Sequence, residues 1–447
     1  MAALSLFLSP QIQTFQSKTM RIRALLTACC LSVLTVPVLS VLEPSPLFAD
    51  WPSLRGPDGH GRVEGNLPNS WGDADYSWRF SLGSRDVGSV AVAGGRAHLL
   101  AYDPKTSSLT LHAVSMDGGA LMWKKSFPIG SYHMHARNSY AASTPTIADE
   151  KIYIAYADDN HTWLRCLTMA GEKVWSRDFG PWQSDHGFGT SPAVIGSYVV
   201  IYDSQQAEEL PVGKSPSHER MIAVDAQTGK DAWMTPLKPT RTCYGVSAEY
   251  RSPDGTLQVI NAGTGNGLFG LDATTGEKLW ELSVFDKRVV STPLVVGDVA
   301  FATCGSGGGG NSLAAVKIPA NKTEQPELLY RLERAAPYVP TCAVDGDFLM
   351  MVSDNGIASR VRIADGEVIW SERIGGNYGA SPIIIGDKML AISLDGKAMI
   401  LQCGDAFKKL GEVSLGGAVG ASPAYSDGKL LLRVDDELRC LTINENL

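Results

Sequence analysis

The chain has 447 residues, with 46 glycines, 24 prolines and only 19% charged residues. This balance is typical of many short strands joined by tight turns, and it excludes a disordered or coiled-coil protein. The formal net charge of −8 argues against nucleic acid as a partner, because the phosphate backbone repels an acidic protein.

The first 49 residues have the order of a secretory signal peptide. Arg21 and Arg23 precede an apolar run over residues 24–42, and the small residue Ala49 closes the segment. We therefore predict a signal peptide at residues 1–49. Export to the periplasm or the cell surface follows from this prediction.

The signal leaves one alternative open, because an apolar run of this length can also stay in the membrane as an anchor. Pro37 within the run and the small residue at its end favour cleavage. Met20 is an alternative start, since residues 1–19 add nothing that a signal needs. Cleavage leaves 36 basic and 46 acidic residues, a net charge of −10, and no later stretch is apolar enough to span a membrane. Six cysteines remain, which we expect to be buried small side chains.

Residues 50–75 are predicted to be an extended segment in front of a repeat that covers residues 76–447. Tryptophans mark the repeat at intervals of 45–58 residues, and one interval of 90 residues hides a copy near Tyr330. A second marker, Ser or Thr followed by Pro, recurs out of phase with the first. The closing tryptophans are Trp78, Trp123, Trp175, Trp233, Trp280 and Trp370.

Each copy is predicted to contain four short strands. Four antiparallel strands in about 40–50 residues make a blade of a β-propeller, and eight copies of each marker predict eight blades. Seven blades would result if one degenerate copy were an insertion. The strands expected in the copy at residues 189–233 are 189–194, 198–202, 221–225 and 230–233.

The ring is predicted to close through its two ends. The last copy supplies three strands over residues 421–443 and lacks a fourth. Residues 76–80 form a fourth strand with no copy before them. Pairing them with the last copy removes the exposed edges of an open array, so Trp78 is expected beside Cys440.

Residues 223–233 read Ala-Val-Asp-Ala-Gln-Thr-Gly-Lys-Asp-Ala-Trp, and residues 270–280 follow the same order with glycine in the first place. This repeated segment resembles the tryptophan-docking motif of the pyrroloquinoline-quinone (PQQ)-like propellers. The resemblance implies that each Trp ring packs between neighbouring blades while Asp and Thr side chains fix the turn. Residues 51–59 and 137–145 also resemble segments of exported propellers of planctomycete-type bacteria.

The resemblance leaves function open, since the family includes quinoprotein dehydrogenases and also the cofactor-free lipoprotein of outer-membrane protein assembly. The dehydrogenases hold PQQ with calcium, use a catalytic Asp and often carry a vicinal disulfide. The only adjacent cysteine pair of this sequence, Cys29-Cys30, lies in the signal. The chain therefore resembles the cofactor-free branch more closely, and no catalytic, cofactor-binding or metal-binding residue is assigned.

Segments that lead into the early blades carry the candidate site residues. His133 and His135 lie on one side of an extended strand, and His186 precedes the next Ser-Pro strand, so both segments are expected at one mouth of the channel. Imidazoles suit zinc or copper, while hydrogen-bonded surface loops are the simpler interpretation. The candidates for the channel mouth are His133, His135, Arg137, Asp185, His186, Arg241 and Tyr244.

Three other features have a simple structural interpretation. Tyr250, with Arg241 and Tyr244, flanks a degenerate Ser-Pro strand, which marks either a ligand pocket or drift of the repeat. Residues 305–312 have the spacing of a phosphate loop, but Asn311 replaces the required Lys, which favours an interstrand loop. His60 is expected in an exposed turn.

We predict a non-catalytic exported propeller that acts as a scaffold or binding module for a protein or a polysaccharide, as a monomer and without a cofactor. The alternative is a quinone-dependent or metal-dependent oxidoreductase, with PQQ and calcium bound at the channel mouth. The complete repeat, the short loops and the lack of a coherent catalytic set favour the first hypothesis.

Overall fold

The computed structural model describes residues 51–210 and 213–443. The predicted signal peptide lies outside the described residues. Within them, no helix is long and apolar enough to cross a membrane. The regular structure in this part of the chain is β-strand, apart from a single 3-10 turn at Asp73–Asp75.

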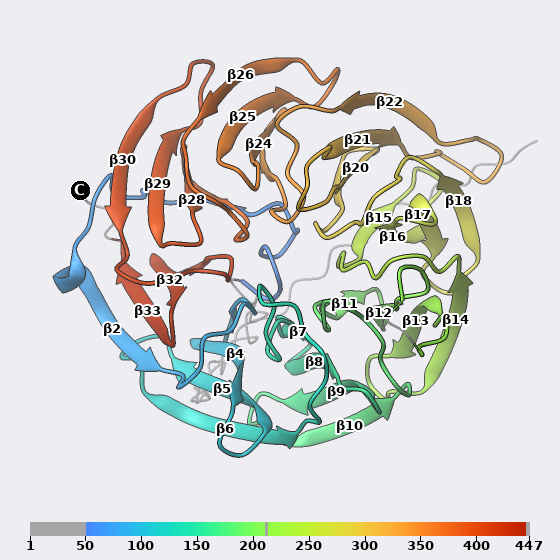
Figure 1. Ribbon diagram of the computed structural model, residues 1–447, viewed down its shortest axis with the longest axis horizontal. Helices are drawn as coiled ribbons and strands as arrows, with labels where there is room; N and C mark the ends of the chain where they lie inside the picture. The colour runs from blue at the N-terminus through green and yellow to red at the C-terminus, as the bar shows by residue number, and fades with distance from the viewer. Residues whose placement is uncertain (1–50, 211–212, 444–447) are drawn as a thin grey trace, which may run out of the picture. The chain divides into compact units, whose positions relative to one another are not determined.

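The strands form eight sheets around a central channel (Figure 1), each with four antiparallel strands, and β1 (Arg62–Val63) adds a fifth, parallel strand to one of them. We number these sheets as blades in chain order, and each blade runs from an inner strand at the channel to an outer strand at the rim. Blades 1 to 4 consist of β3 (Ala91–Ala93), β4 (Arg96–Asp103), β5 (Ser108–Ser115) and β6 (Leu121–Pro128); β7 (Thr146–Ala148), β8 (Lys151–Ala157), β9 (Thr162–Thr168) and β10 (Lys173–Asp178); β11 (Ala193–Ile195), β12 (Tyr198–Ser204), β13 (Glu219–Asp225) and β14 (Asp231–Leu237); and β15 (Ala248–Arg251), β16 (Leu257–Gly263), β17 (Gly267–Asp272) and β18 (Lys278–Leu282).

The second half of the ring repeats this order. Blades 5 to 7 consist of β19 (Leu294–Val296), β20 (Val299–Cys304), β21 (Ser312–Lys317) and β22 (Glu327–Leu332); β23 (Ala343–Asp345), β24 (Phe348–Val352), β25 (Ile357–Arg362) and β26 (Val368–Arg373); and β27 (Ile383–Ile385), β28 (Lys388–Ile392), β29 (Lys397–Gln402) and β30 (Lys409–Ser414). Blade 8 joins the two ends of the described chain and consists of β31 (Ala424–Ser426), β32 (Lys429–Val434), β33 (Glu437–Thr442) and β2 (Tyr76–Ser81).

Blade 8 confirms the predicted closure. Strand β2 pairs antiparallel with β33, and Trp78 lies opposite Cys440 in the register. The prediction of eight four-stranded blades is also confirmed. Because β2 completes the last sheet, the edge strands of an open array are replaced by backbone hydrogen bonds.

The predicted inner strand at 189–194 is wrong at its start, since β11 covers only Ala193–Ile195. The residues before it do other work. Pro192 has no N–H to give to a ladder, and the Ser191 hydroxyl accepts the backbone N–H of Thr144 from the previous blade at 2.9 Å. The Ser/Thr-Pro marker therefore joins neighbouring blades instead of opening a strand.

The same bond recurs around the channel. At six positions the backbone N–H of a marker Ser or Thr is donated to the marker hydroxyl of the next blade, over 2.9–3.1 Å. This series of hydrogen bonds is interrupted at blade 4, where the Ser247 hydroxyl instead accepts a hydrogen bond from the side-chain amide of Asn261. The donor and acceptor pairs are Ser89 and Thr144, Thr144 and Ser191, Thr292 and Thr341, Thr341 and Ser381, Ser381 and Ser422, and Ser422 and Ser89.

The docking tryptophans join the blades near the rim. In five cases the indole N–H is donated over 2.8–3.0 Å to a backbone carbonyl in the turn between the third and fourth strands of the next blade. Tyr330 replaces Trp in blade 5 and donates its hydroxyl to the Ile363 carbonyl in the same way. Trp280 differs, because it donates to Gln258 in its own blade. The five regular pairs are Trp78 with Met116, Trp123 with Met169, Trp175 with Ala226, Trp233 with Ala273, and Trp370 with Gly404.

The turn glycines make room for these rings. Gly229 has φ +69°, and a Cβ added there would lie 2.6 Å from the Trp175 ring. We expect Gly229→Ala to lower the free energy of unfolding by more than Gly297→Ala. Gly297 also has a positive φ, but nothing lies within 4 Å of an added Cβ, so its variant carries only the backbone strain of roughly 1–3 kcal/mol. Urea denaturation of both variants checks this, and equal losses would contradict it.

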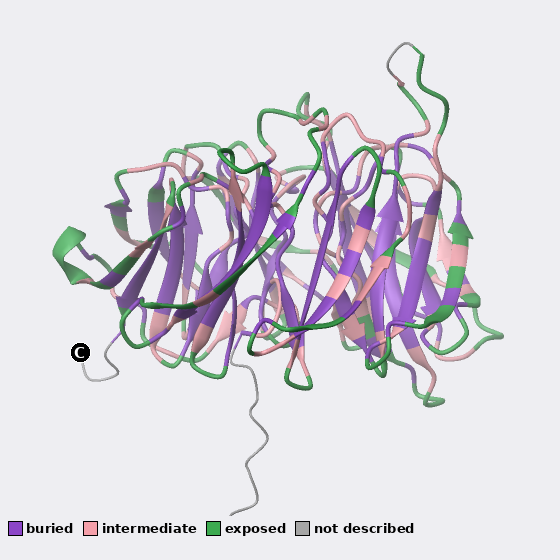
Figure 2. Ribbon diagram, turned by 90° about the horizontal axis from the view of Figure 1, so that it is seen from below, coloured by how far each residue is buried: buried purple, intermediate pink, exposed green. Residues whose placement is uncertain are grey.

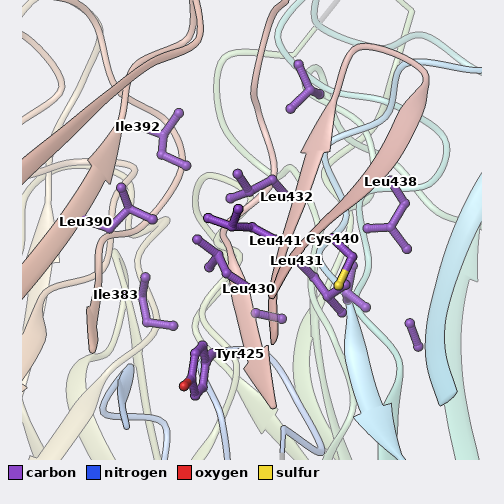
Figure 3. Packing of buried hydrophobic residues seen from close by; sticks show 14 of the residues in the cluster. Ile383, Leu390, Ile392, Tyr425, Leu430, Leu431, Leu432, Leu438, Cys440 and Leu441 are labelled. Carbon is purple, nitrogen blue, oxygen red and sulfur yellow. The ribbon is translucent and has the colours of Figure 1, made fainter. Parts of the chain in front are cut away.

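Blade 7 has no docking aromatic at its predicted position, residues 409–411. The chain before β2 fills this place, because Leu67 and Trp71 are buried in the cluster shared by blades 7 and 8. The Asn69 carbonyl lies so close to Gly411 that a Cβ there would approach it to 1.8 Å. Figure 3 shows the apolar side chains of this cluster, with Ile383, Leu390 and Ile392 facing those of blade 8.

Burial follows the blades. Figure 2 shows that the strands are largely buried and that exposed residues gather in the loops at both edges of the ring. The six described cysteines are free, and five of them are buried, which agrees with their interpretation as small apolar side chains.

Candidate functional site: the channel mouth

Residues 51–63 occupy the channel. Trp51 exchanges backbone hydrogen bonds with Val92 of β3, and the Pro52 carbonyl accepts the Ile147 N–H of β7. In blade 7, two blades from blade 1 around the ring, β1 (Arg62–Val63) pairs parallel with β27. Figure 1 shows this dark-blue segment at the centre of the ring before the chain turns outward to β2. The segment therefore gives hydrogen-bond partners to inner strands that would otherwise face an open channel.

Arg55 holds this segment at its centre. Its guanidinium is buried and donates to the carbonyls of Cys342 at 2.6 Å and Pro382 at 2.8 Å, in the segments that lead into blades 6 and 7. Burial lowers the pKa of Arg55 to about 10. The prediction of His60 as an exposed turn residue is wrong, because its ring is hydrogen-bonded to the Val295 carbonyl of β19 and its own carbonyl accepts the Val344 N–H of β23.

The opposite end of the channel is formed by the segments that link each outer strand to the next inner strand. We call this end the mouth. The ring of His135 stacks on that of His186, with centroids 4.9 Å apart and an angle of 14° between the planes. His186 in turn lies beside Arg288, whose Nη1 donates to His186 Nε2 over 3.2 Å. Segments leading into blades 2, 3 and 5 thus meet at this point.

Two tyrosines complete the cluster. The Tyr244 hydroxyl lies 3.1 Å from the Ser184 hydroxyl, and the Tyr244 N–H is donated to the Val289 carbonyl. Tyr338 lies beside Arg288 from the segment leading into blade 6. We call His135, His186, Tyr244, Arg288 and Tyr338 the mouth cluster.

The electrostatics of the cluster are cationic. Burial, together with the nearby Arg288 and His135, lowers the pKa of His186 to about 4, so its ring is neutral near pH 7. Arg288 takes part in none of the ion pairs found among the described residues. The groups that favour its charged form are the phenols of Tyr338 and Tyr244 and the thiol of Cys243.

Asp354 is the carboxylate beside the cluster, and its two oxygens accept the N–H groups of Tyr338 and Val339 at 2.6 and 3.1 Å. Burial raises the pKa of Asp354, although these backbone bonds and the charge of Arg137 act to lower it. Arg137 comes from the segment leading into blade 2, whereas Asp354 belongs to blade 6, so the mouth is spanned from opposite sides of the ring. Both carboxylate oxygens of Asp354 are therefore already engaged in hydrogen bonds to backbone N–H groups.

Several polar atoms in the segments that form the mouth are buried without a hydrogen-bond partner. Among them are the Tyr132 hydroxyl, Nδ1 of His186 and Nε of Arg288. Because Nε2 of His186 accepts from Arg288, Nδ1 carries the proton of the neutral ring, and this atom is a donor. Buried donors without acceptors are rare in native proteins, and each one needs an explanation such as a ligand or ordered water.

The structure brings most of the predicted mouth residues together. His135, His186 and Tyr244 belong to the mouth cluster, and His133 and Arg137 act electrostatically on its members or on Asp354. Two predicted residues lie in mouth segments but make their side-chain contacts outside the cluster. Arg241 is paired with exposed Glu209, and Asp185 accepts from Gln206 at 3.5 Å.

Arg288, Tyr338 and Asp354 are mouth residues that the sequence pattern did not predict. A positional signal for the first two was present, because Tyr244, Arg288 and Tyr338 each stand three or four residues before the marker Ser or Thr of their blades. Asp354 carries no such signal, since it lies in the turn between β24 and β25.

The glycine-rich segment between β20 and β21 is an interstrand loop, as its sequence predicted. The loop acts as a hydrogen-bond acceptor, because the carbonyls of Gly309 and Gly310 each accept a hydrogen bond from Lys287 Nζ at 2.9 Å. A phosphate would need the opposite polarity, with N–H groups directed inward. This loop therefore fixes a lysine at the mouth.

The residues at the mouth do not fit PQQ with calcium. Calcium needs six to eight oxygen ligands, several of them carboxylates. No group of three or more His, Cys, Asp or Glu side chains suited to a metal occurs in the described part of the chain. Asp354, the carboxylate beside the cluster, is engaged by two backbone N–H groups. We therefore derive no step through a quinone.

A family model described as outer membrane protein assembly factor BamB matches residues 73–243 and 216–372, about two-thirds of the chain. The chain belongs to this family of PQQ-like repeat propellers. No curated protein matches the sequence at a significant level.

Solved structures share the fold at low sequence identity. BamB from Moraxella catarrhalis is 16% identical with a TM-score of 0.55, over 79% of this chain and 92% of that one. Quinohemoprotein alcohol dehydrogenase from Comamonas testosteroni is 12% identical with a TM-score of 0.64, over 89% and 81%. The computationally designed Ika8 protein is 11% identical with a TM-score of 0.59, over 83% and 100%. At these identities the likeness extends to the fold alone.

Proposed function

We propose that this exported PQQ-like propeller is a non-catalytic binding module that takes a polysaccharide segment at its mouth. The observation that carries the proposal is the arrangement of the channel. Residues 51–63 fill one end, and the mouth at the other end gathers polar aromatic and cationic side chains with buried donors that lack acceptors. These side chains offer hydrogen bonds to hydroxyl groups and ring faces for stacking.

The distribution of apolar side chains favours a glycan over a protein partner. Interfaces between proteins have an apolar, aromatic-rich core. The exposed large apolar side chains among the described residues lie on outer strands at the rim, away from the mouth. They are Leu121, Met122, Val174, Met234, Leu328, Leu329 and Val368.

The test is a glycan-binding screen with purified protein, followed by calorimetry on the best ligand. We expect Tyr244→Phe and Tyr338→Phe each to weaken binding about tenfold or less, because each loses one hydrogen-bonding hydroxyl worth roughly 0.5–1.5 kcal/mol. Tyr198→Phe is the matched control, since Tyr198 opens β12 at the opposite end of the ring. Capture of an exported protein without any glycan binding, or quinone binding with dye-coupled oxidation of an alcohol, would overturn the proposal.

A further inference from the structure

We propose that the mouth cluster recognises a carboxylate on the bound glycan, such as that of a uronic acid residue, through the guanidinium of Arg288. This assignment rests on the proposed binding role and adds the chemical class of the ligand. It depends on the position of Arg288, on its lack of an anionic partner, and on the neighbouring His186, whose Nδ1 is buried without a hydrogen-bond partner.

The position of Arg288 is fixed by the backbone. Its carbonyl accepts the Gly305 N–H at 3.0 Å, and Arg288 pairs with Gly305 as an isolated bridge. The guanidinium is then held between the His186 ring and Tyr338. A side chain anchored on both sides loses little conformational freedom when it binds a ligand.

Arg288 lacks the carboxylate partner that fully buried Arg433 and half-buried Arg220 have. Arg433 is paired with Asp86, and Arg220 with Asp203, at 2.8 and 2.6 Å. Arg288 meets an imidazole nitrogen and phenols, while Asp354 nearby is held by backbone N–H groups. The Nε atom of Arg288 is also buried without an acceptor. A buried donor without a hydrogen bond is costly, so an anionic ligand would supply the acceptor that the chain lacks here.

The shape of the guanidinium favours a carboxylate. The planar fork of Arg pairs with a planar carboxylate through two parallel hydrogen bonds, whereas a lysine such as Lys287 beside it offers only a point charge. Nδ1 of His186 supplies a further donor without a partner. The His135 ring stacks on one face of His186 and so fixes the plane in which Nδ1 lies.

Calorimetry with an oligogalacturonide and with a neutral galacto-oligosaccharide of equal length tests the assignment. We expect the acidic glycan to bind at least tenfold more tightly, with an affinity that falls as salt rises. Arg288→Gln should remove this preference, and Arg288→Lys should restore only part of it, because Lys lacks the fork. Arg251→Gln is the matched control, because Arg251 ends the inner strand β15 on the face of the ring away from the mouth.

The outcomes separate this assignment from the proposed binding role. Equal affinity for both glycans, or an unchanged preference in a folded Arg288→Gln protein, overturns the carboxylate assignment and leaves glycan binding intact. A sulfated galactan that binds as tightly as the oligogalacturonide also overturns it, because the site would then respond to charge alone. If neither glycan binds, and a protein partner does, both proposals fail.

Discussion

Replacing Asp86 by alanine is expected to lower the free energy of unfolding by roughly 3–5 kcal/mol, because it leaves a buried guanidinium without its partner. Asp86 and Arg433 have 2% and 1% of their side-chain surface exposed, and their atoms lie 2.8 Å apart. Arg433 belongs to blade 8, whereas Asp86 lies just before blade 1. The ion pair therefore sits where the two ends of the ring meet.

The local contacts make the loss severe. Asp86 also accepts the Tyr102 N–H at 3.1 Å and the Ser84 hydroxyl at 2.6 Å. Arg433 donates to the carbonyls of Gly88 and Leu100 at 3.1 and 2.9 Å. Removing the carboxylate thus breaks a network that joins blade 8 to blade 1, and the ring loses part of its closure.

Urea denaturation measures the effect, with Asp117→Ala as the matched control. Asp117 pairs with Lys429 across the same two blades, but its side chain is 94% exposed, so its loss should change stability little. The double variant Asp86→Leu with Arg433→Met should recover part of the loss, because it buries no unpaired charge. Equal stability of Asp86→Ala and Asp117→Ala would refute this account of the closure.

The ring itself could be predicted because its signals are local. The Trp, the turn glycine and the Ser/Thr-Pro marker each act between neighbouring blades, and they recur with the blade, so the sequence displays them as a repeat. Tyr330 could be placed by interval alone, and its hydroxyl takes the role of the indole N–H. Closure could be predicted by counting strands, because the last repeat lacks a fourth strand and the segment before the first repeat supplies one.

The contents of the channel could not be predicted, because they depend on contacts that occur once. Arg55 bonds to carbonyls 287 and 327 residues away, and no repeat marks such a pair. Trp71 fills the place of the missing aromatic of blade 7, yet in the sequence it is a lone Trp in a polar segment. His60 looked like a turn residue for the same reason. A residue whose contacts occur only once leaves no repeated pattern in the sequence, so its burial cannot be predicted from the repeat.

Replacing Glu219 is expected to change how the free energy of unfolding depends on pH. Its side chain is buried between blades 3 and 4, where Oε1 accepts the Tyr202 hydroxyl and the Asn266 amide. Oε2 is buried without a partner. Burial raises the pKa of Glu219 from 4.5 to about 7, despite the hydrogen bonds that favour the charged form.

A carboxyl group whose pKa is higher in the folded state binds its proton more tightly there, so it stabilises the fold most at low pH. This contribution is complete below pH 4.5 and is lost as pH rises to about 7. The interval corresponds to roughly 3 kcal/mol at about 1.4 kcal/mol for each pH unit. Glu219→Gln keeps the shape of the protonated side chain and removes the titration.

We therefore expect Glu219→Gln to match the parent protein near pH 4.5 and to exceed it in stability by roughly 3 kcal/mol at pH 8. Denaturation of both proteins at each pH gives the difference. Burial lowers the pKa of His98 and His112 to about 4, which makes stability fall on acidification, but both proteins share that effect and the difference cancels it. Glu412→Gln, at an exposed carboxylate whose pKa is lowered by Lys409, should show no such gain at high pH. A flat difference between Glu219→Gln and the parent would mean that Glu219 is charged throughout, held by its hydrogen bonds against the cost of burial.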